Sequence, residues 1–403
     1  MITWFDNRPN YQHVEDFFKL YDWSIDACEL SLNSTAIQNL LNRKPKFDVI
    51  LVEQFNSDCM MGVAWKLNAP VIGLSSCSMM PWHYERFANP LIPSYMPSVF
   101  LGFSDNMSYA ERLTNWITVH SFNFMYKYIT LKKNNEITRK YIRDDNMPHL
   151  EELVKKTSML FVNTHYSLSG SRPTAPTVIE LGGVHIKEAK PLDDELQQYL
   201  DSAKDGVIYV SWGSMIRGDT LPPEKRNSFL KVFASFKQKV LWKWENGTLP
   251  NKPENVLIRN WMPQRDILCH PNVRVFVSHG GLMGSSEAAY CGVPMVLTPM
   301  YGDQFQNAKA AESRGMGLIV HWETLNEETM KNAINQALRP DTMKYAKEVS
   351  YSFQNRPIKS IDEAVWWTEY VAATHGAPLL KSNSMHLSAI VYYSFDIYAT
   401  IAV

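Results

Sequence analysis

Residues 273–299 combine side chains and turns that could bind a phosphate group. The apolar run 273–277 has the β-branched and aromatic residues of a buried parallel strand. It ends in Ser278-His279-Gly280-Gly281, where two glycines let the backbone turn tightly and approach a ligand. Gly284-Ser285-Ser286-Glu287 then predicts a helix start with serine as the N-cap, and Gly292 ends that helix before a second apolar strand. A glycine turn that opens a helix at a strand's carboxyl end is typical of phosphate sites in α/β folds.

Two polar side chains could donate hydrogen bonds to such a phosphate. His279 stands at the end of the strand, where its ring can reach a phosphate oxygen. Ser214 lies in the turn Trp212-Gly213-Ser214, which follows an earlier predicted strand, and could donate to the same group. A serine in such a turn can equally be a simple turn former, so the phosphate prediction depends mainly on His279.

Three further side chains suit the ribose and base of a nucleotide. Glu287 would repel a phosphate at close range, but its carboxylate could accept hydrogen bonds from a ribose diol. Trp261 and Gln264 lie in a proline-broken loop after another strand, where the indole could stack on a flat base and the amide could reach the ribose. Taken alone, the same two residues would be a core tryptophan and a surface glutamine.

An acid–amide pair follows the next strand. Asp303 and Gln304 lie in a loop at the same end of the predicted sheet, and such a pair can bind the vicinal hydroxyls of a sugar. As isolated loop residues they would be ordinary turn formers. Together with the nucleotide features, they favour a nucleotide-sugar ligand.

The elements that must position these residues form two blocks of alternating strands and helices. The first block has a strand at 46–53, a helix at 58–67 and a strand at 70–74, with later strands at 158–163 and 177–181. The second block has strands at 206–211, 240–244, 255–259, 273–277, 295–299 and 317–320 with helices between them. This alternation predicts two doubly wound α/β domains that face a cleft.

Charge and cysteine usage exclude several classes of protein. Among 403 residues, 40 Lys and Arg balance 41 Asp and Glu, so nothing indicates a nucleic-acid partner, which would need a basic excess or patch. The five cysteines are scattered without a C-x-x-C spacing. We therefore expect mostly buried free thiols, with neither a disulfide scaffold nor a zinc site.

The signals for cellular location conflict. Three N-x-S/T sequons, at Asn33, Asn106 and Asn246, suit a lumenal protein but also arise by chance. No apolar signal-peptide region follows Met1. The final residues, 387–403, are largely apolar but contain Asp396, and the run is slightly shorter than the roughly 20 residues that span a bilayer. They could form an amphipathic C-terminal helix or the start of a membrane anchor.

The combined spacing resembles a known family signature. W-x-P-Q at 261–264, H-G-G-x-x-G-x-x-E at 279–287 and P-x-x-x-D-Q at 299–304 closely resemble the donor-binding signature of the UDP-glycosyltransferases, above all the animal membrane-bound enzymes. The resemblance also covers FDVILVE, GGVHIKEAKPL, WGSM and AVWWTEYV, and so extends over nearly the whole chain. It implies a fold of the GT-B type: an incomplete acceptor-binding domain at 1–186, a UDP-sugar-binding domain at 187–375 and a tail at 376–403.

The resemblance also implies a role for each motif residue. Trp261 would stack on uracil, the Met262 backbone would meet the polar edge of the base, and Gln264 with Glu287 would hold the ribose. The diphosphate would be bound by Ser214, His279 and the amides near Gly281, Gly284 and Ser285. The hydroxyls of the transferred sugar would be bound by Asp303 and Gln304. Met283 departs from the family, which often has Asn or Ser here, so backbone amides must make that contact.

The family reaction displaces UDP from the anomeric carbon of the sugar by an acceptor hydroxyl, with inversion. A helix N-terminus and a histidine stabilise the leaving diphosphate without a metal, and no Asp-x-Asp metal-binding pair is evident here. The resemblance implies UDP-glucose or UDP-glucuronic acid as co-substrate, no other cofactor, and small lipophilic acceptors. It also implies a place on the lumenal side of the endoplasmic reticulum membrane and possible homo- or hetero-oligomers with related enzymes.

The catalytic base is the weak point of this interpretation. In the family, a histidine after the first strand removes the acceptor proton and an acidic residue orients it. We do not recognise that segment and expect the chain to start inside the acceptor domain. The orienting acid would be Glu53 at a strand end or Asp58 at the following helix start; both stay open. The alternative function is therefore a non-catalytic partner that binds UDP-sugar.

Overall fold

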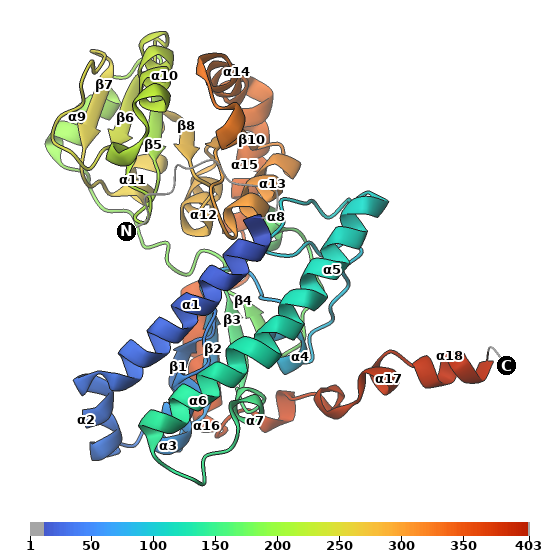
Figure 1. The fold of residues 1–403 in the computed structure, drawn as a ribbon. Coiled ribbons are helices and arrows are strands. Elements are labelled where there is room, and N and C mark those ends of the chain that lie inside the picture. Colours follow the sequence, from blue (N-terminus) through green and yellow to red (C-terminus); the bar gives the residue numbers. More distant parts are fainter. Residues whose placement is uncertain (1–11, 402–403) are drawn as a thin grey trace.

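The chain forms two α/β domains, one above the other in Figure 1, each built on a parallel sheet. The computed structural model describes residues 12–401. This arrangement confirms the predicted doubly wound fold. Because parallel strands need crossover connections, helices cover the sheets and the strands are strongly apolar.

The N-terminal sheet has four parallel strands in the order β1-β2-β3-β4. Its strands follow the predicted positions closely: β1 (Ile50–Glu53), β2 (Val71–Ser75), β3 (Met159–Val162) and β4 (Val178–Glu180). Within the described part of the chain, β1 pairs only with β2, so it forms an edge of this sheet. The helices of this domain are α1 (Gln12–Asn33), α2 (Thr35–Arg43), α3 (Met60–Leu67), α4 (His83–Arg86), α5 (Tyr109–Met125), α6 (Leu131–Ile142), α7 (Leu150–Val154) and α8 (Tyr166–Ser169).

The long helical stretch that runs from α5 to α6 contains one turn of different geometry. Helix α5 starts with a capping box, in which Ser108 accepts from the Glu111 amide and Glu111 accepts from the Ser108 amide. A π-helical turn at Tyr126–Thr130 then joins α5 to α6. Tyr126 is buried there, stacked on Trp82 with ring centroids 4.0 Å apart. The π turn keeps this tyrosine in the core while the helix continues.

The C-terminal sheet has six parallel strands in the order β10-β9-β8-β5-β6-β7. The chain winds from β5 toward one edge and from β8 toward the other, so the strand order reverses between β5 and β8. Ligands of doubly wound sheets bind outside the carboxyl ends of the strands at such a point. The strands are β5 (Val207–Ser211), β6 (Lys239–Lys243), β7 (Val256–Arg259), β8 (Val273–Ser278), β9 (Met295–Leu297) and β10 (Gly317–Ile319). The helices are α9 (Asp194–Asp201), α10 (Pro223–Ala234), α11 (Gln264–Leu268), α12 (Leu282–Cys291), α13 (Gln304–Ser313), α14 (Glu327–Ala337) and α15 (Pro340–Gln354).

Helix α16 (Ser360–Ala373) belongs to the N-terminal domain by packing, although it follows the C-terminal domain in sequence. Its Val371 is fully buried in a cluster with Ile72 and Met159 of the N-terminal sheet. The expected domain at 187–375 includes this helix by sequence, whereas its buried side packs on the N-terminal sheet. Its aromatic residues gave no sign of which sheet it would cover.

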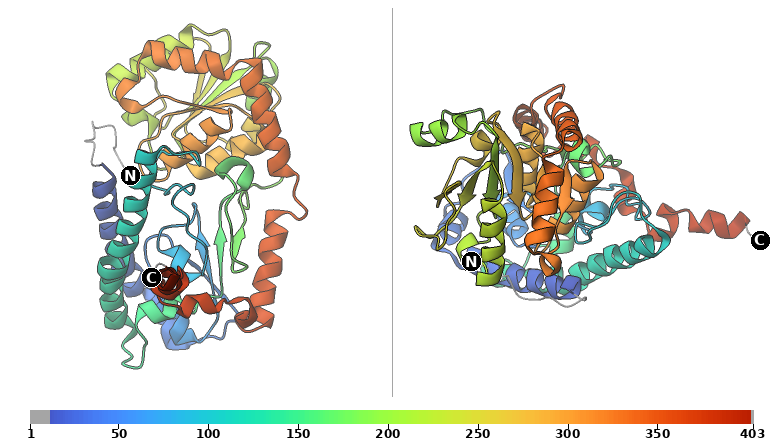
Figure 2. Two further views of the ribbon diagram at one scale, coloured as in Figure 1. Left: turned by 90° about the vertical axis from the view of Figure 1, so that its right-hand side faces the viewer. Right: turned by 90° about the horizontal axis from the view of Figure 1, so that it is seen from above.

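The C-terminal tail leaves the body of the molecule (Figure 2). It contains two short helices, α17 (Ala389–Tyr392) and α18 (Phe395–Ile401), with exposed apolar side chains such as Ile390 and Tyr398. No helix within residues 12–401 is long and apolar enough to cross a bilayer.

Two disulfides correct the expectation of free thiols. Cys28 of α1 pairs with Cys59 beside α3, and Cys269 after α11 pairs with Cys291 at the end of α12. Cys77 is a buried free thiol. The prediction was wrong because it relied on spacing in sequence, whereas helix packing brings each pair together: α11 packs on α12, and α1 and α3 both pack on α6.

Candidate active site

A cavity of about 540 Å³ opens at the carboxyl ends of β5, β6, β7 and β8. It lies at the point where the strand order of the C-terminal sheet reverses, which is the position that the fold favours for a nucleotide. Of the residues predicted to bind the donor, the following line it: Ser214, Trp261, Met262, Gln264, His279, Gly281, Gly284 and Glu287.

Helix α12, whose N-terminus the sequence predicts as a phosphate site, begins earlier than expected. Helix α12 starts at Leu282 with Gly281 as its N-cap, so Ser285 and Ser286 lie inside the helix and are buried. The Ser285 amide donates to the Gly281 carbonyl at 3.0 Å and is not available to a ligand. The amides of Leu282, Met283 and Gly284 occupy the first turn, where the helix offers them no carbonyl. Any anion at this helix end would therefore meet those three amides.

His279 is fixed between two glycines. A Cβ at Gly213, where φ is +74°, would lie 2.8 Å from the His279 ring, and a Cβ at Gly281 would lie 2.5 Å from it. Only glycine therefore allows the β5 and β8 turns to close on this ring. Burial, and secondarily the charge of Lys243, lower the pKa of His279 to about 4. The imidazole is neutral near pH 7 and can donate one hydrogen bond to a phosphate oxygen.

Lys243 is a site residue that the sequence reading missed. It ends β6, is only 8% exposed and lines the cavity. Its Nζ donates to the Gly213 carbonyl at 3.0 Å and to Glu245 Oε1 at 2.7 Å. The same ammonium lies 5.9 Å from the centroid of the Trp261 ring. A lysine at the end of an apolar strand resembles an ordinary strand-end charge, so nothing in the sequence marked it.

The tryptophan at the mouth of the cavity has an open face. Trp261 is 71% exposed, an unusual position for so large an apolar side chain, whereas its neighbour Met262 is buried. Because Trp261 lines the cavity and no core covers it, a flat base could stack on its indole.

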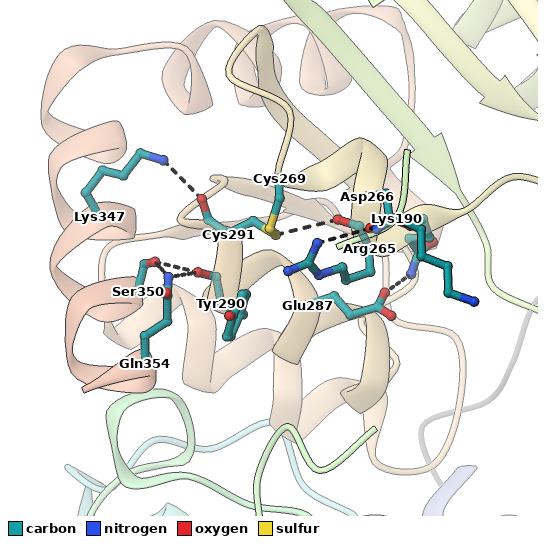
Figure 3. Close-up of a disulfide and its surroundings, with 11 residues drawn as sticks. Lys190, Arg265, Asp266, Cys269, Glu287, Tyr290, Cys291, Lys347, Ser350 and Gln354 are labelled. Carbon is teal, nitrogen blue, oxygen red and sulfur yellow. Dashed lines mark hydrogen bonds and ion pairs between the residues drawn. A yellow bond between two sulfur atoms is a disulfide. The ribbon is translucent and has the colours of Figure 1, made fainter. Parts of the chain in front are cut away.

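Gln264 and Glu287 form a pair on the cavity wall. The Gln264 amide donates to Glu287 Oε2 at 2.6 Å, and the Tyr209 hydroxyl donates to Gln264 Oε1 at 3.3 Å. Burial raises the pKa of Glu287, and the hydrogen bond from Gln264 offsets part of that effect. The Cys269–Cys291 disulfide, shown with Glu287 in Figure 3, ties the end of α11 to the end of α12.

Asp303 and Gln304 lie beside the phosphate turn rather than in the wall of the cavity. Gln304 is buried, and its Oε1 accepts from the Met300 amide at 2.8 Å. Asp303 Oδ2 accepts from Asn307 Nδ2 at 2.8 Å, and Asn307 also donates to the Gly280 carbonyl at 3.0 Å. Burial raises the pKa of Asp303. The pair is thus held against Gly280, the residue that precedes the helix N-cap.

A second cavity, of about 470 Å³, lies next to the first, and its walls are mainly apolar, with a few polar side chains such as Glu53 and Ser76. It extends between the ends of β1 to β3 and helix α16. His185 and Met283 line both cavities, and His185 Nε2 lies 3.2 Å from the Met283 carbonyl oxygen. The two cavities therefore meet at the first turn of α12. The sequence alone did not indicate His185, because its position between the two cavities depends on the path of the linker that carries it.

The two candidate acids lie in different surroundings. Glu53 ends β1, lines the apolar cavity and accepts hydrogen bonds from the Ser76 amide at 3.1 Å and the Ser76 hydroxyl at 3.2 Å. Its surface is exposed, yet the protein around the carboxylate desolvates it enough to raise its pKa, against the effect of the Ser76 bonds. Asp58 is fully buried. It accepts two bonds from Arg86, at 2.9 and 2.6 Å, and one from the Tyr126 hydroxyl at 2.7 Å.

Within residues 12–401, no three or more His, Cys, Asp or Glu side chains are grouped so as to hold a metal ion. The charged groups around the first cavity include the Lys243 ammonium, the helix N-terminus and the Glu287 carboxylate, and Lys187, Glu188, Lys190, Arg265 and Asp266 also line it. This set suits a nucleotide whose phosphates meet amides and whose ribose meets a carboxylate.

A comparison of structures supports the fold. The chain is similar to the "Glycotransferase of kitacinnamycin", with a TM-score of 0.57 and 19% sequence identity over 87% of this chain and 83% of that one. At this identity the likeness concerns the fold alone, which is that of a two-domain glycosyltransferase of the GT-B type.

Comparisons of sequence define the family. Residues 3–402 match the family described as "UDP-glucoronosyl and UDP-glucosyl transferase". The chain is 37% identical to UDP-glycosyltransferase UGT5 of Dactylopius coccus, over 90% of this chain and 69% of that protein. It is 30% identical to UDP-glucuronosyltransferase 2A1 of Mus musculus, over 98% of this chain and 76% of that protein. The chain belongs to the UDP-glycosyltransferase family, whose enzymes transfer a sugar from a UDP-sugar co-substrate, and the predicted resemblance is confirmed.

Proposed function

We propose that the protein transfers a hexose, glucose or glucuronic acid, from its UDP-sugar to a hydroxyl of a small lipophilic acceptor, with inversion at the anomeric carbon. The observation that carries this proposal is the meeting of the two cavities at His185 and Met283. One cavity has the groups for a nucleotide diphosphate, and the other has the apolar walls for a lipophilic molecule. A sugar bound at their junction would be exposed to the acceptor on the side away from UDP.

In the donor cavity, uracil would stack on Trp261 with its polar edge toward the Met262 backbone. The ribose hydroxyls would donate to Glu287, held in place by Gln264 at 2.6 Å. The diphosphate would accept hydrogen bonds from His279, Ser214 and the first-turn amides of α12. Lys243, buried at the same wall, adds positive potential to this region. We exclude the Ser285 amide from the proposed set because it donates to Gly281.

The proposed reaction is a direct displacement. The acceptor oxygen attacks the anomeric carbon from the face opposite the diphosphate while the bond from that carbon to the phosphate oxygen breaks. Negative charge then grows on UDP, where the helix N-terminus and the His279 ring oppose it. Fixed dipoles stabilise a transition state well when they need no rearrangement, and the glycines around His279 supply that rigidity.

We propose Glu53, rather than Asp58, as the acidic residue of the acceptor site. Glu53 faces the apolar cavity, and its raised pKa is typical of a carboxyl group that takes part in proton transfer. Asp58 already holds Arg86 and Tyr126 inside the core and has no open face for a substrate. Glu53 would orient the residue that receives the acceptor proton.

We propose Asp303 and Gln304 as the residues that bind the sugar hydroxyls. Asn307 links Asp303 to the carbonyl of Gly280, the residue before the N-cap of α12. Asp303 and Gln304 would therefore lie near the phosphate that carries the sugar. Gln304 Oε1 is occupied by the backbone of residues 300 and 301, so its Nε2 would make the contact. Neither residue distinguishes glucose from glucuronic acid.

We further propose that the protein works on the lumenal side of the endoplasmic reticulum membrane. Two disulfides support this, because they form readily in an oxidising compartment and rarely in the cytosol. The apolar tail around α17 and α18 would contact the membrane or a related subunit. Sedimentation with membranes after carbonate washing would support this location, and full release into the soluble fraction would contradict it.

The function is tested by a single-turnover assay with radiolabelled UDP-glucose or UDP-glucuronic acid and a simple phenol. We expect one glucoside or glucuronide of inverted configuration and an increase in melting temperature on adding UDP. Stabilisation by UDP without any product would support the alternative, a non-catalytic partner that binds UDP-sugar. If UDP did not stabilise the protein and no product formed, both functions would be contradicted.

A further inference from the structure

The chain passes between its two domains twice, first after β4 and again between α15 and α16 (Figure 2). In the first crossing, Val184 packs in the apolar cluster of the N-terminal sheet, and Ile186 packs in the core of the C-terminal sheet. The residue between them is His185, which lines both cavities. The first crossing therefore passes through the junction at which we place the sugar.

The second crossing packs against the first. Phe353, near the end of α15, is buried in the core of the C-terminal sheet, whereas Val371 of α16 is buried in the cluster of the N-terminal sheet. A Cβ at Gly183, where φ is +81°, would lie 2.8 Å from the Phe353 ring, so the two segments touch there. Arg356 lies between α15 and α16, and its side chain is only 16% exposed.

The Arg356 guanidinium ties the second crossing to the first. Its Nη2 donates to the Glu180 carbonyl at 2.9 Å, and its Nη1 donates to the Gly182 carbonyl at 3.2 Å. The same group donates to Ser360 Oγ at 2.8 Å and to Glu363 Oε2 at 3.1 Å, both in the first turn of α16. Because α15 ends at Gln354, almost directly before Arg356, this planar side chain also fixes where the C-terminal domain joins the N-terminal sheet.

The two domains also meet at the first turn of α12. Leu282, the first residue of that helix, is buried in an apolar cluster of the N-terminal domain together with Phe100 and Phe122. His185 Nε2 lies 3.2 Å from the carbonyl oxygen of the next residue, Met283. The turn that we propose to bind the diphosphate therefore lies directly against the acceptor domain. A rotation of one domain on the other would displace the acceptor cavity relative to that turn.

We propose that Arg356 is a positioning residue for sugar transfer, which acts by holding the donor and acceptor cavities aligned where they meet at His185. The inference rests on the proposed function, because it concerns the rate of the same displacement. The attacking oxygen must lie close to the anomeric carbon and in line with the leaving diphosphate, and a misplacement of about 1 Å can cost roughly 100-fold in rate. Arg356 lines neither cavity, so it acts through the orientation of the domains and not by contact with a substrate.

The test compares Arg356→Ala with the natural protein in the single-turnover assay, with the rate expressed per UDP-binding site. Calorimetric titration should give an unchanged affinity for UDP, because the residues proposed to bind UDP all belong to the C-terminal domain. The transfer rate per site should fall roughly 100-fold. A role in stability alone would lower the melting temperature or the number of sites and leave the rate per site unchanged, which would overturn the proposal. A loss of UDP affinity would overturn it as well.

Two further variants control for charge and for folding. Lys359 also lies in the second crossing, but it reaches the linker only through an ion pair with Glu188 at 3.7 Å, in which both side chains are mostly exposed. Such a pair contributes little, so Lys359→Ala should keep the natural rate. Arg356→Lys keeps the charge beside Glu363 without the planar fork, and its rate should lie between those of Arg356→Ala and the natural protein. A full natural rate in Arg356→Lys would overturn the role of the fork, and this variant provides the test if Arg356→Ala does not fold.

A distance measurement reports on the two domains directly and needs no product. Spin labels at Asn227→Cys on α10 and Lys132→Cys on α6, both exposed positions, place one probe on each domain. We expect Arg356→Ala to shift or broaden the distribution of distances and Lys359→Ala to leave it unchanged. An unchanged distribution in Arg356→Ala would overturn the positioning role. If the natural protein formed no product, the proposed function would be contradicted, and these distances would decide the role of Arg356 by themselves.

Discussion

At the scale of single residues, Trp261 has the most unusual setting in the donor cavity. Because the Trp261 indole is 71% exposed, it contributes little to the packing of the core. Its function must therefore depend on a molecule that binds against it. The turn Trp261-Met262-Pro263 holds it at the mouth of the cavity because Met262 is anchored in the core directly beside it. A base that stacks there would meet a surface fixed in advance.

We therefore expect Trp261→Ala to weaken UDP binding without unfolding the protein. Stacking of a base on an aromatic ring contributes about 1–3 kcal/mol, which corresponds to a loss in UDP affinity of roughly 5- to 150-fold. Calorimetric titration with UDP measures this loss. Trp116→Ala is the control, because Trp116 is 54% exposed on α5, away from both cavities, and should leave the affinity unchanged. Equal affinity of both variants would contradict the stacking role.

Variants of Glu53 and Asp58 should separate an effect on the reaction rate from an effect on the stability of the fold. Glu53→Gln keeps an oxygen for the Ser76 hydrogen bonds but removes the charge, so we expect kcat to fall about 100-fold or more with little change in melting temperature. Asp58→Asn leaves the buried Arg86 guanidinium without its counter-charge and should cost about 3–5 kcal/mol of unfolding free energy. Kinetic assays and urea denaturation of both variants test this. A large loss of stability in Glu53→Gln alone would reverse the assignment.

At the scale of elements, the donor cavity depends on how α11 and α12 are held together. Helix α11 carries Gln264 and helix α12 carries Glu287, and the Cys269–Cys291 disulfide joins their C-terminal ends (Figure 3). The Gln264–Glu287 hydrogen bond joins them again near the ligand. The covalent link therefore limits how far Gln264 and Glu287, the proposed ribose-binding pair, can separate.

Replacing both cysteines with Cys269→Ser and Cys291→Ser should increase the KM for UDP-sugar. A disulfide between cysteines 22 positions apart stabilises a protein by about 3 kcal/mol, so the melting temperature should also fall. The matched control is the pair Cys28→Ser and Cys59→Ser, which should lower the melting temperature with no change in KM. Steady-state kinetics and thermal denaturation separate the two effects. An equal change in KM for both double variants would show that the Cys269–Cys291 disulfide has no particular effect on the donor cavity.

At the scale of the whole molecule, buried histidines link stability to pH. Burial, and secondarily the nearby Arg86 charge, lower the pKa of His83 to about 3. Burial likewise lowers the pKa of His165 to about 4, with a smaller effect from Arg356. The unfolded chain takes up these protons near pH 6.5, whereas the folded chain resists them. Their contribution to stability is therefore complete above about pH 6.5 and is lost as the pH falls toward the folded values.

We expect the unfolding free energy to decrease steadily between pH 6.5 and pH 4. The fully buried His83 alone should contribute a loss of roughly 2 kcal/mol at pH 5. Urea denaturation across this range, for the natural protein and for His83→Gln, measures the slope. The variant is expected to be less stable overall but to have a shallower slope, because one titrating group has been removed. An identical slope in both proteins would contradict the buried neutral state of His83.

Much of the fold and of the donor site was predictable because both depend on local pattern. Apolar runs and glycine breaks marked the strands of both sheets, and the structure has them within a few residues of the predicted positions. The motif residues from Trp261 to Glu287 belong to one contiguous stretch, so their convergence follows from two successive strand–turn–helix units, β7–α11 and β8–α12. The helix start within that stretch was misplaced because Gly281, rather than a serine, takes the N-cap position.

The sequence by itself determined the order of strands and helices, the family and the glycine-rich stretch that lines the first cavity, since each is encoded by neighbouring residues. Only the tertiary structure decided the cysteine pairs, the separation of Glu53 from the buried Asp58, the return of α16 to the first sheet and the places of Lys243 and His185. Each of these is a contact between residues far apart in the chain. The packing of whole layers fixes such contacts, because a side chain's surroundings depend on which helices cover which sheet.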